Sequence, residues 1–183
     1  MKKVSLIILK LLNYKIDIVN IPQEKKYVLV FAPHTSWTDF ALGKIALTAM
    51  GIHTTFLIKK ELFFFPLGIF LNYLGGYPVD RKHAKNLTDL LAKYIKEKEE
   101  IAFLITPEGT RKRVETWKRG FYYIAQKANV PLALAYLDYR ERKGGIGPIF
   151  YPTGNYEEDF QKVENFYRGM RGKRKGYFNL ENS

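Results

Sequence analysis

Two spacings of apolar residues alternate along the chain. Short apolar runs rich in β-branched and aromatic side chains are typical of buried strands, and apolar residues repeated every three or four positions are typical of packed helices. The predicted strands cover residues 16–21, 27–32, 54–58, 77–81, 101–106 and 130–139. The predicted helices cover residues 40–50, 87–95, 117–129 and 156–170. This alternation predicts an α/β fold, a single three-layer domain with a mostly parallel sheet and helices on both faces.

One domain is expected to span residues 1–183, because no shift in composition marks a boundary. Residues 1–26 form an amphipathic N-terminal segment whose apolar face covers the core or lies in a membrane interface. Residues 27–139 form the core with the candidate motifs. Residues 140–183 carry a helix and a basic tail, and the Gly- and Pro-rich stretch 144–148 is expected to be a loop.

Basic residues outnumber acidic ones, with 30 Lys and Arg against 18 Asp and Glu, so the formal net charge is +12. A field of this sign attracts polyanions: nucleic acid, an anionic bilayer surface or phosphorylated substrates. Because cysteine is absent, a thiol nucleophile, a disulfide framework and a Cys-ligated metal are excluded. The three histidines do not predict a His-rich zinc site either, so no metal is expected.

The most apolar stretch, residues 62–71, is too short to span a bilayer. One interpretation is a core helix with Pro66 in its first turn. The other is a surface that lies in lipid or lines an acyl-chain tunnel, because cations and tyrosines flank it as they do at a headgroup boundary. On the second interpretation the residues in contact with the membrane are Phe63, Phe64, Phe65, Lys59 and Lys60.

A histidine and an aspartate lie where the strand 27–32 gives way to a helix. Ser36 and Asp39 have the spacing of a capping box, which leaves His34 in the turn between strand and helix. There the Asp39 carboxylate can accept a hydrogen bond from one ring nitrogen of His34, and the other nitrogen can take a proton from a hydroxyl. The alternative is a structural histidine beside a helix-capping aspartate.

A second apolar strand, 101–106, runs into the polar turn 107–111. Parallel strands end at one edge of a sheet, so this turn is expected to face His34. A glycine in the turn allows close approach to a ligand, and the arginine fork matches phosphate. A base beside phosphate-binding groups indicates that a hydroxyl of a phosphorylated molecule is deprotonated. The expected substrate-binding residues are Arg81, Glu108, Gly109, Thr110, Arg111 and Lys118.

These motifs resemble, in order, four sequence blocks of the 1-acylglycerol-3-phosphate acyltransferases and related glycerolipid acyltransferases. The resemblance runs from about residue 27 to residue 137 and includes the H-x4-D and P-E-G-T-R motifs. The matching blocks are residues 34–39, 75–81, 107–111 and 130–133, and a K-x-G-x4-A pattern falls on Lys118, Gly120 and Ala125. Two departures bear on the acyl acceptor: Pro33 replaces the usual asparagine, and residues 133–135 lack a second proline.

The resemblance implies a glycerolipid-acyltransferase-like fold and an O-acyltransferase of phospholipid biosynthesis. His34, oriented by Asp39, would deprotonate a lysophospholipid such as 1-acylglycerol-3-phosphate, and the alkoxide would attack the thioester of acyl-CoA or acyl-carrier protein. No cofactor is implied beyond this co-substrate. The protein is expected in the cytoplasm, bound peripherally to anionic lipid at the inner face of the cell membrane, with no nucleic-acid partner.

Three alternatives remain open at this stage. A divergent family member would acylate a different amphiphile. An esterase or thioesterase would use the same base with water as the acceptor. A non-catalytic basic domain that binds nucleic acid or membranes would explain the charge, but it would leave the pairing of His34 with Asp39 without a purpose.

Overall fold

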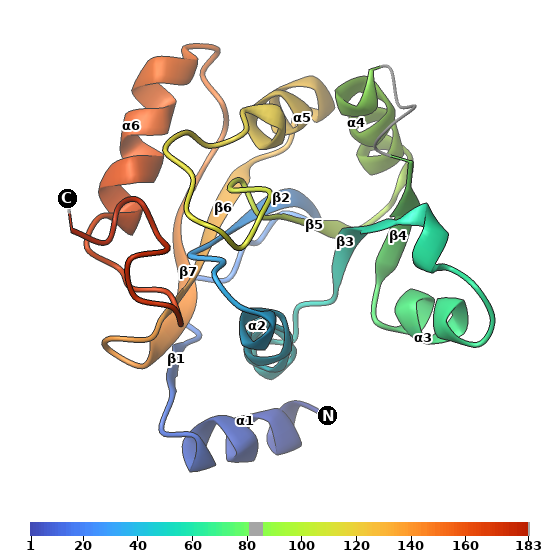
Figure 1. The fold of residues 1–183 in the computed structure, drawn as a ribbon. Helices are drawn as coiled ribbons and strands as arrows, with labels where there is room; N and C mark the ends of the chain where they lie inside the picture. Colours follow the sequence, from blue (N-terminus) through green and yellow to red (C-terminus); the bar gives the residue numbers. More distant parts are fainter. Residues whose placement is uncertain (81–85, 183) are drawn as a thin grey trace.

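The computed structural model describes residues 1–80 and 86–182, which form one seven-stranded sheet (Figure 1). The strand order is β1-β7-β6-β2-β5-β3-β4, and all neighbouring strands are parallel except β6 and β7. The strands are β1 (Lys15–Asp17), β2 (Lys26–Ala32), β3 (Thr54–Lys59), β4 (Gly76–Val79), β5 (Ile101–Ile105), β6 (Leu132–Asp138) and β7 (Lys143–Phe150). The predicted mostly parallel sheet is confirmed.

Helices lie on both faces of the sheet, as the alternating pattern predicts (Figure 1). They are α1 (Lys2–Leu11), α2 (Trp37–Met50), α3 (Leu67–Tyr73), α4 (Leu87–Glu97), α5 (Gly120–Ala128) and α6 (Tyr156–Tyr167), with a short 3₁₀ turn η1 (Lys60–Leu62). One core joins the sheet to α1 and α2, and a second core joins it to α4, α5 and α6. The domain therefore has three layers.

Strand β2 is buried on both faces, which is why it reads as an unbroken apolar run. Its side chains alternate between the two cores: Val28 and Val30 pack with α4, α5 and α6, and Leu29 and Phe31 pack with α2. The strand lies between β5 and β6, and the residues that follow these three strands emerge at one edge of the sheet. The predicted active-site edge is built here.

The stretch 144–148 was expected to be a loop, and this expectation is wrong. These residues belong to β7, which pairs antiparallel with β6. Their glycines serve close packing: a Cβ on Gly147 would lie 2.1 Å from the Phe166 ring, and one on Gly145 would lie 2.9 Å from the carbonyl oxygen of Asp17. Glycine inside a strand thus marks close approach of neighbouring groups here and not a turn.

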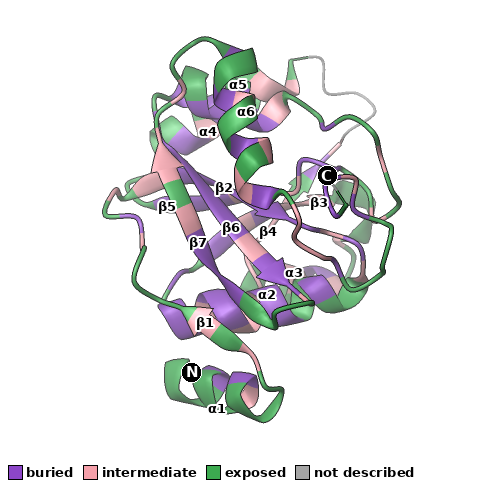
Figure 2. Cartoon of the chain, turned by 90° about the vertical axis from the view of Figure 1, so that its left-hand side faces the viewer, coloured by how far each residue is buried: buried purple, intermediate pink, exposed green. Residues whose placement is uncertain are grey.

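The C-terminal residues do not form a solvated tail. Helix α6 ends at Tyr167, and residues 171–182, here called the strap, fold back along the sheet edge (Figure 1). Phe178 and Leu180 are buried in the core that α6 covers. Figure 2 colours the whole chain by burial and shows the C-terminal segment beside the sheet. A run of charge in the sequence concealed these two anchors.

The expectation that residues 62–71 form a core helix is wrong as well. Helix α3 lies at the surface, and only Gly68 of this helix is buried. Phe64, Phe65, Ile69 and Phe70 are between 56% and 84% exposed and form what we call the aromatic patch. The stretch is therefore a surface, and its contact with lipid stays a prediction.

Helix α1 divides its apolar residues between the core and the surface. Leu9 is buried, whereas Val4, Ile7 and Leu11 are exposed. The segment therefore covers part of the core and still presents an apolar face. Within the described residues, no helix combines the length and the apolar character that crossing a bilayer requires.

Candidate active site

The turn after β2 is organised by the carboxylate of Asp39. Oδ2 of Asp39 accepts hydrogen bonds from the backbone N–H of Thr35 (2.6 Å) and of Ser36 (2.7 Å). Ser36 caps α2 in return, accepting from the N–H of Thr38, so the predicted capping box is present. Asp39 is completely buried, which fixes the direction in which its carboxylate points.

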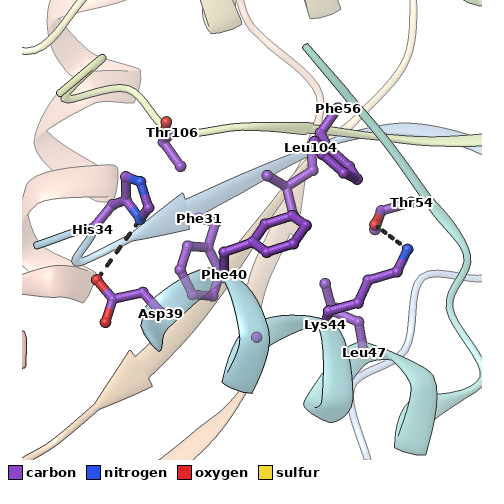
Figure 3. A pocket seen from close by; sticks show the side chains of 11 residues that line it. Phe31, His34, Asp39, Phe40, Lys44, Leu47, Thr54, Phe56, Leu104 and Thr106 are labelled. Carbon is purple, nitrogen blue, oxygen red and sulfur yellow. Dashed lines mark hydrogen bonds and ion pairs between the residues drawn. The ribbon is translucent and has the colours of Figure 1, made fainter. Parts of the chain in front are cut away.

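His34 faces this carboxylate at the exit of β2 (Figure 3). Its Nδ1 lies 3.7 Å from Oδ2 of Asp39, which is too far for the predicted hydrogen bond because two backbone amides already hold that oxygen. Nδ1 is buried, and no described residue bonds to it. Burial lowers the pKa of His34, and Arg111 acts in the same direction while Asp39 opposes it. A neutral imidazole at neutral pH can accept a proton.

A tyrosine that the sequence did not single out completes the environment of Asp39. The hydroxyl of Tyr139 donates to Oδ1 of Asp39 at 2.6 Å and lies 3.3 Å from the hydroxyl of Thr38. Burial, followed by the hydrogen bond to Asp39, raises the pKa of Tyr139, so it stays protonated and keeps its donor. Tyr139 directly follows β6, and a search of every strand end for polar residues would have found it.

Glu108 joins the second turn to the first. Its Oε2 accepts a hydrogen bond from the backbone N–H of His34 at 2.9 Å, and the side chain is 4% exposed. Burial raises the pKa of Glu108 to about 9, against the opposing effect of that hydrogen bond, so the group is a neutral acid at pH 7. The sequence predicted substrate binding for Glu108, whereas the observed contact is a brace for the catalytic turn.

Arg111 is stacked on an exposed tryptophan at the start of α2. Its guanidinium carbon lies 3.5 Å from the ring centre of Trp37, which is 75% exposed and was also missed from the sequence. Nη1 of Arg111 is buried and has no hydrogen-bond partner among the described residues. A planar cation held in this way, with an unused donor near His34, is suited to bind a phosphate or carboxylate.

The other predicted binding residues gather on the same loop. Gly109 has φ +66, and a Cβ there would lie 2.8 Å from Cε of Lys118, so the lysine side chain packs over the glycine. The backbone N–H of Lys118 donates to the carbonyl of Pro107 at 2.9 Å. Thr110 is exposed, and its hydroxyl accepts from the N–H of Lys112. The predicted Arg81 lies outside the described residues.

An apolar slot leads away from His34 between α2 and the sheet (Figure 3). The slot is narrow, with a cavity volume of about 40 Å³, and part of it is open to solvent. Its apolar lining is Phe31, Phe40, Leu47, Phe56 and Leu104, with Gly43 beneath the Phe31 ring. In Figure 3, Phe31 and Phe40 lie between His34 at one end and Lys44 at the other. The slot therefore offers apolar walls directly beside the base.

A half-buried lysine closes the far end of this slot. Nζ of Lys44 donates to the carbonyl of Leu74 at 2.8 Å and to the hydroxyl of Thr54 at 3.4 Å. Burial lowers the pKa of Lys44, and its ammonium group donates hydrogen bonds to these two oxygens. An alkyl chain that entered the slot beside His34 would thus meet a polar group at the far end of the slot.

The predicted membrane-contact residues lie apart from the loop of Arg111. Lys59 ends β3, a strand parallel to β5, so it emerges at the same sheet edge as the two turns. Lys59, Lys60, Phe64 and Phe65 are exposed, and Phe63 is half-buried. These side chains belong to the surface that carries the aromatic patch.

Two comparisons place this arrangement among known proteins. The sequence profile of the family described as Acyltransferase matches residues 15–137, more than half of the chain. The structure is similar to the crystal structure of the 1-acyl-sn-glycerophosphate (LPA) acyltransferase PlsC from Thermotoga maritima, with a TM-score of 0.63 and 21% sequence identity. That match covers 88% of this chain and 72% of the other, and it shows the shared fold. No curated protein sequence matches the chain significantly.

Proposed function

The chain belongs to the acyltransferase family, and we propose that it transfers a fatty acyl group from a thioester to a hydroxyl of a lysophospholipid such as 1-acylglycerol-3-phosphate. The donor is acyl-CoA or acyl-carrier protein. One observation carries this proposal: a half-buried His34, whose pKa is lowered by burial and by Arg111, lines an apolar slot, and Nη1 of Arg111 has no hydrogen-bond partner among the described residues. A base, an anion-binding group and an apolar surface for an alkyl chain are what this reaction requires.

The reaction proceeds by direct transfer. His34 turns its Nε2, the nitrogen away from Asp39, to the acceptor hydroxyl and takes the proton as the oxygen attacks the thioester carbonyl. The C–O bond forms, the tetrahedral intermediate collapses, and the C–S bond breaks to release a thiolate. The imidazolium then returns the proton to the sulfur. Asp39, 3.7 Å from Nδ1, stabilises the imidazolium while it exists.

The acceptor is oriented by its phosphate. Arg111 offers that group an unpaired, charge-assisted donor, and stacking on Trp37 holds the guanidinium plane in place. The alkyl chain lies along the apolar slot, since the slot walls between His34 and Lys44 are mainly aromatic and aliphatic side chains. Substrates of this kind partition into membranes, so the proposal includes peripheral binding at the inner face of the cell membrane.

Product formation by purified protein tests the proposal. The protein is incubated with 1-acylglycerol-3-phosphate and either acyl-CoA or acyl-carrier protein, and the diacyl product is measured by mass spectrometry. We expect product with the wild type and none above background with His34→Ala. Hydrolysis of the thioester at an unchanged rate without acceptor would instead identify a thioesterase, and a panel of other lysolipids would reveal a different acceptor.

Membrane binding is tested separately by co-sedimentation with liposomes. Anionic liposomes should retain the wild type even in high salt, because aromatic insertion does not depend on charge. Phe64→Asp combined with Phe65→Asp should abolish the salt-resistant part, since both side chains belong to the exposed aromatic patch. Absence of binding to anionic liposomes at low salt would overturn this part of the proposal.

A further inference from the structure

The strap lies directly beside the catalytic turn. The backbone N–H of Arg174 donates to the hydroxyl of Thr35 at 3.2 Å, and Thr35 is completely buried. Further back, the N–H of Arg171 donates to Oδ1 of Asp138 at 3.2 Å, and the N–H of Tyr139 donates to the carbonyl of Arg171 at 2.9 Å. The strap is therefore tied to the first turn and to the end of β6.

Its distal half is tied to the segment that follows the second turn. Nε1 of Trp117 donates to Oδ1 of Asn179 at 3.0 Å, and Glu181, 3% exposed, accepts from the N–H of Gly176 at 2.7 Å. Together with the buried Phe178, these contacts hold the strap as a fixed part of the domain. Side chains that project from it keep a constant position relative to His34.

Three consecutive cations of the strap have no acidic partner among the described residues, and Nζ of the first, Lys173, lies 5.6 Å from the ring centre of Tyr139. Lys173, Arg174 and Lys175 are exposed, and no carboxylate of a described residue lies within 4.0 Å of their charged groups. Arg174 lies 5.5 Å from the ring centre of Tyr177, which is 39% exposed. The strap thus combines unneutralised positive charge with an accessible aromatic ring.

The carboxylates nearest in sequence and structure are already engaged. Asp138 and Glu181 are both buried, and both accept hydrogen bonds from backbone N–H groups. They hold the strap in shape, and neither forms an ion pair with Lys173, Arg174 or Lys175. An anionic ligand that approaches from solvent would meet the field of these cations first.

We propose that Lys173, Arg174, Lys175 and Tyr177 bind the phosphate-bearing nucleotide end of acyl-CoA. This inference rests on the proposed acyl transfer and adds the location of the donor. Acyl-CoA carries its phosphates far from the thioester, on the other side of the pantetheine arm. A donor site must therefore present cations outside the catalytic turn but within reach of a donor whose thioester lies at that turn. The cations of the strap meet this condition.

Two further points favour a nucleotide over other anions. The buried donor of Arg111 is a separate anion site on the opposite loop, so the acceptor's phosphate does not need the strap. Adenine stacks on aromatic rings, and the strap cations have such a ring in Tyr177 beside them. A flat bilayer or a carrier protein would use the charge alone.

Binding of the donor's polar end is measured by calorimetry with CoA and with adenosine 3′,5′-bisphosphate. Combined Lys173→Gln, Arg174→Gln and Lys175→Gln should weaken both about tenfold or more, the effect of losing at least one charge-assisted hydrogen bond. In turnover assays the KM for acyl-CoA should rise by a similar factor, with the KM for the lysophospholipid unchanged. Tyr177→Leu should weaken adenosine 3′,5′-bisphosphate binding, since it removes the stacking surface.

A matched control uses three cations at the opposite edge of the sheet. Lys25, Lys96 and Lys98 are exposed, and Lys96 lies beside the start of β2, because its carbonyl accepts from Nζ of Lys26. Replacing these three by Gln removes the same net charge far from the site, so CoA binding should be retained. Thermal unfolding confirms that both triple variants are folded.

Four outcomes would overturn the inference: wild-type CoA affinity in the strap variant, an equal loss in the control variant, loss of liposome binding alone, or a raised KM for acyl-carrier protein alone. Failure of the proposed function appears differently. A wild type that binds CoA through the strap but acylates no lysolipid would refute acyl transfer and keep the strap site. A wild type that acylates with acyl-CoA while the strap variant binds CoA normally would refute only the strap.

Discussion

The two turns that form the site differ in how their polar groups are satisfied. In the first turn, the carboxylate of Asp39 receives three donors, from Thr35, Ser36 and Tyr139. In the second turn, Arg111 keeps a buried donor without a partner among the described residues. The closed network around Asp39 holds His34, the proposed base, in its turn, and the unused donor of Arg111 is available for the anion of the proposed acceptor. In the proposed reaction, proton transfer and ligand binding are thus divided between two strand ends.

The largest effect is expected from removal of the base. His34→Ala should lower kcat/KM by roughly 10²- to 10⁴-fold, the usual cost of losing a general base. No side chain hydrogen bond of His34 is lost, because Nδ1 has no partner among the described residues, so the fold should persist. Steady-state kinetics and thermal unfolding measure the two effects, and wild-type turnover by the folded variant would disprove the role.

Asp39 requires a different substitution, because the structure gives it a second function. Asp39→Ala would leave the N–H groups of Thr35 and Ser36 without their acceptor, at a cost of about 1–3 kcal/mol each for a buried group. Asp39→Asn keeps an oxygen for these donors and removes the charge that stabilises the imidazolium. We expect Asn to retain most of the stability and to lose most of the activity, and equal loss of both would contradict this division.

The next largest effect is expected from removal of the Arg111 side chain in the second turn. Arg111→Ala should raise the KM for a phosphate-bearing acceptor about 10- to 100-fold, the range for a charge-assisted hydrogen bond, without a matching change for the donor. Arg111→Lys should restore little, because an ammonium neither stacks on Trp37 as a plane nor binds phosphate with two donors. Lys112→Ala, at the exposed neighbouring residue, is the control. A change confined to the donor's KM would reverse the assignment.

The contrast between the turns also shows what a sequence can reveal. The capping box at Ser36 and Asp39 is a local pattern, and it placed His34 correctly in its turn. The apolar runs predicted the central strands because β2 is buried on both faces. Both features are determined by residues close together in the sequence, so they can be predicted from the sequence alone.

Features that depend on distant residues were missed. Tyr139 reaches Asp39 from a position 100 residues away, and the strap turns back through the burial of Phe178, which a basic run conceals. The glycines of β7 signalled a loop, although they are small because Phe166 and Asp17 pack against them. The hydrogen bond predicted between His34 and Oδ2 of Asp39 failed for a local reason instead, because the capping box gives that oxygen to the N–H of Ser36 and the N–H of Thr35 occupies it as well.

A smaller effect is expected when one donor is taken from the closed network. Tyr139→Phe removes the 2.6 Å hydrogen bond to Asp39 and should lower kcat/KM by about fivefold, in line with about 1 kcal/mol for one hydrogen bond. With fewer donors, the Asp39 charge acts more strongly on His34 and raises the pKa of its imidazole. Because the neutral form is active, the acidic limb of the pH profile should move to higher pH.

The control for this variant is Tyr14→Phe. Tyr14 packs edge-on against the ring of Tyr139, with ring centres 5.9 Å apart, but makes no hydrogen bond to Asp39. It should therefore leave the acidic limb in place. A merely structural role for Tyr139 would lower stability in Tyr139→Phe without moving the pH profile, and that result would contradict positioning through Asp39.

The smallest effect on catalysis is expected at the brace between the turns. Glu108→Gln keeps an oxygen for the N–H of His34, so activity at neutral pH should stay close to that of the wild type.

The main effect of Glu108→Gln is expected on the pH dependence of stability. Burial raises the pKa of Glu108 in the folded protein to about 9 from its ordinary value of about 4.5, so between these pH values the folded state holds a proton that the unfolded state has released. The wild type should therefore lose up to about 1.4 kcal/mol of stability per pH unit as pH rises through this window. The Glu108→Gln variant should not show this loss, because Gln cannot ionise. Urea unfolding at pH 5, 7 and 8.5 should show the gap between Glu108→Gln and the wild type widening with pH, whereas the exposed control Glu99→Gln should run parallel to the wild type. Parallel curves for Glu108→Gln as well would mean that Glu108 is ionised in the folded protein, and the brace would then be a charged one.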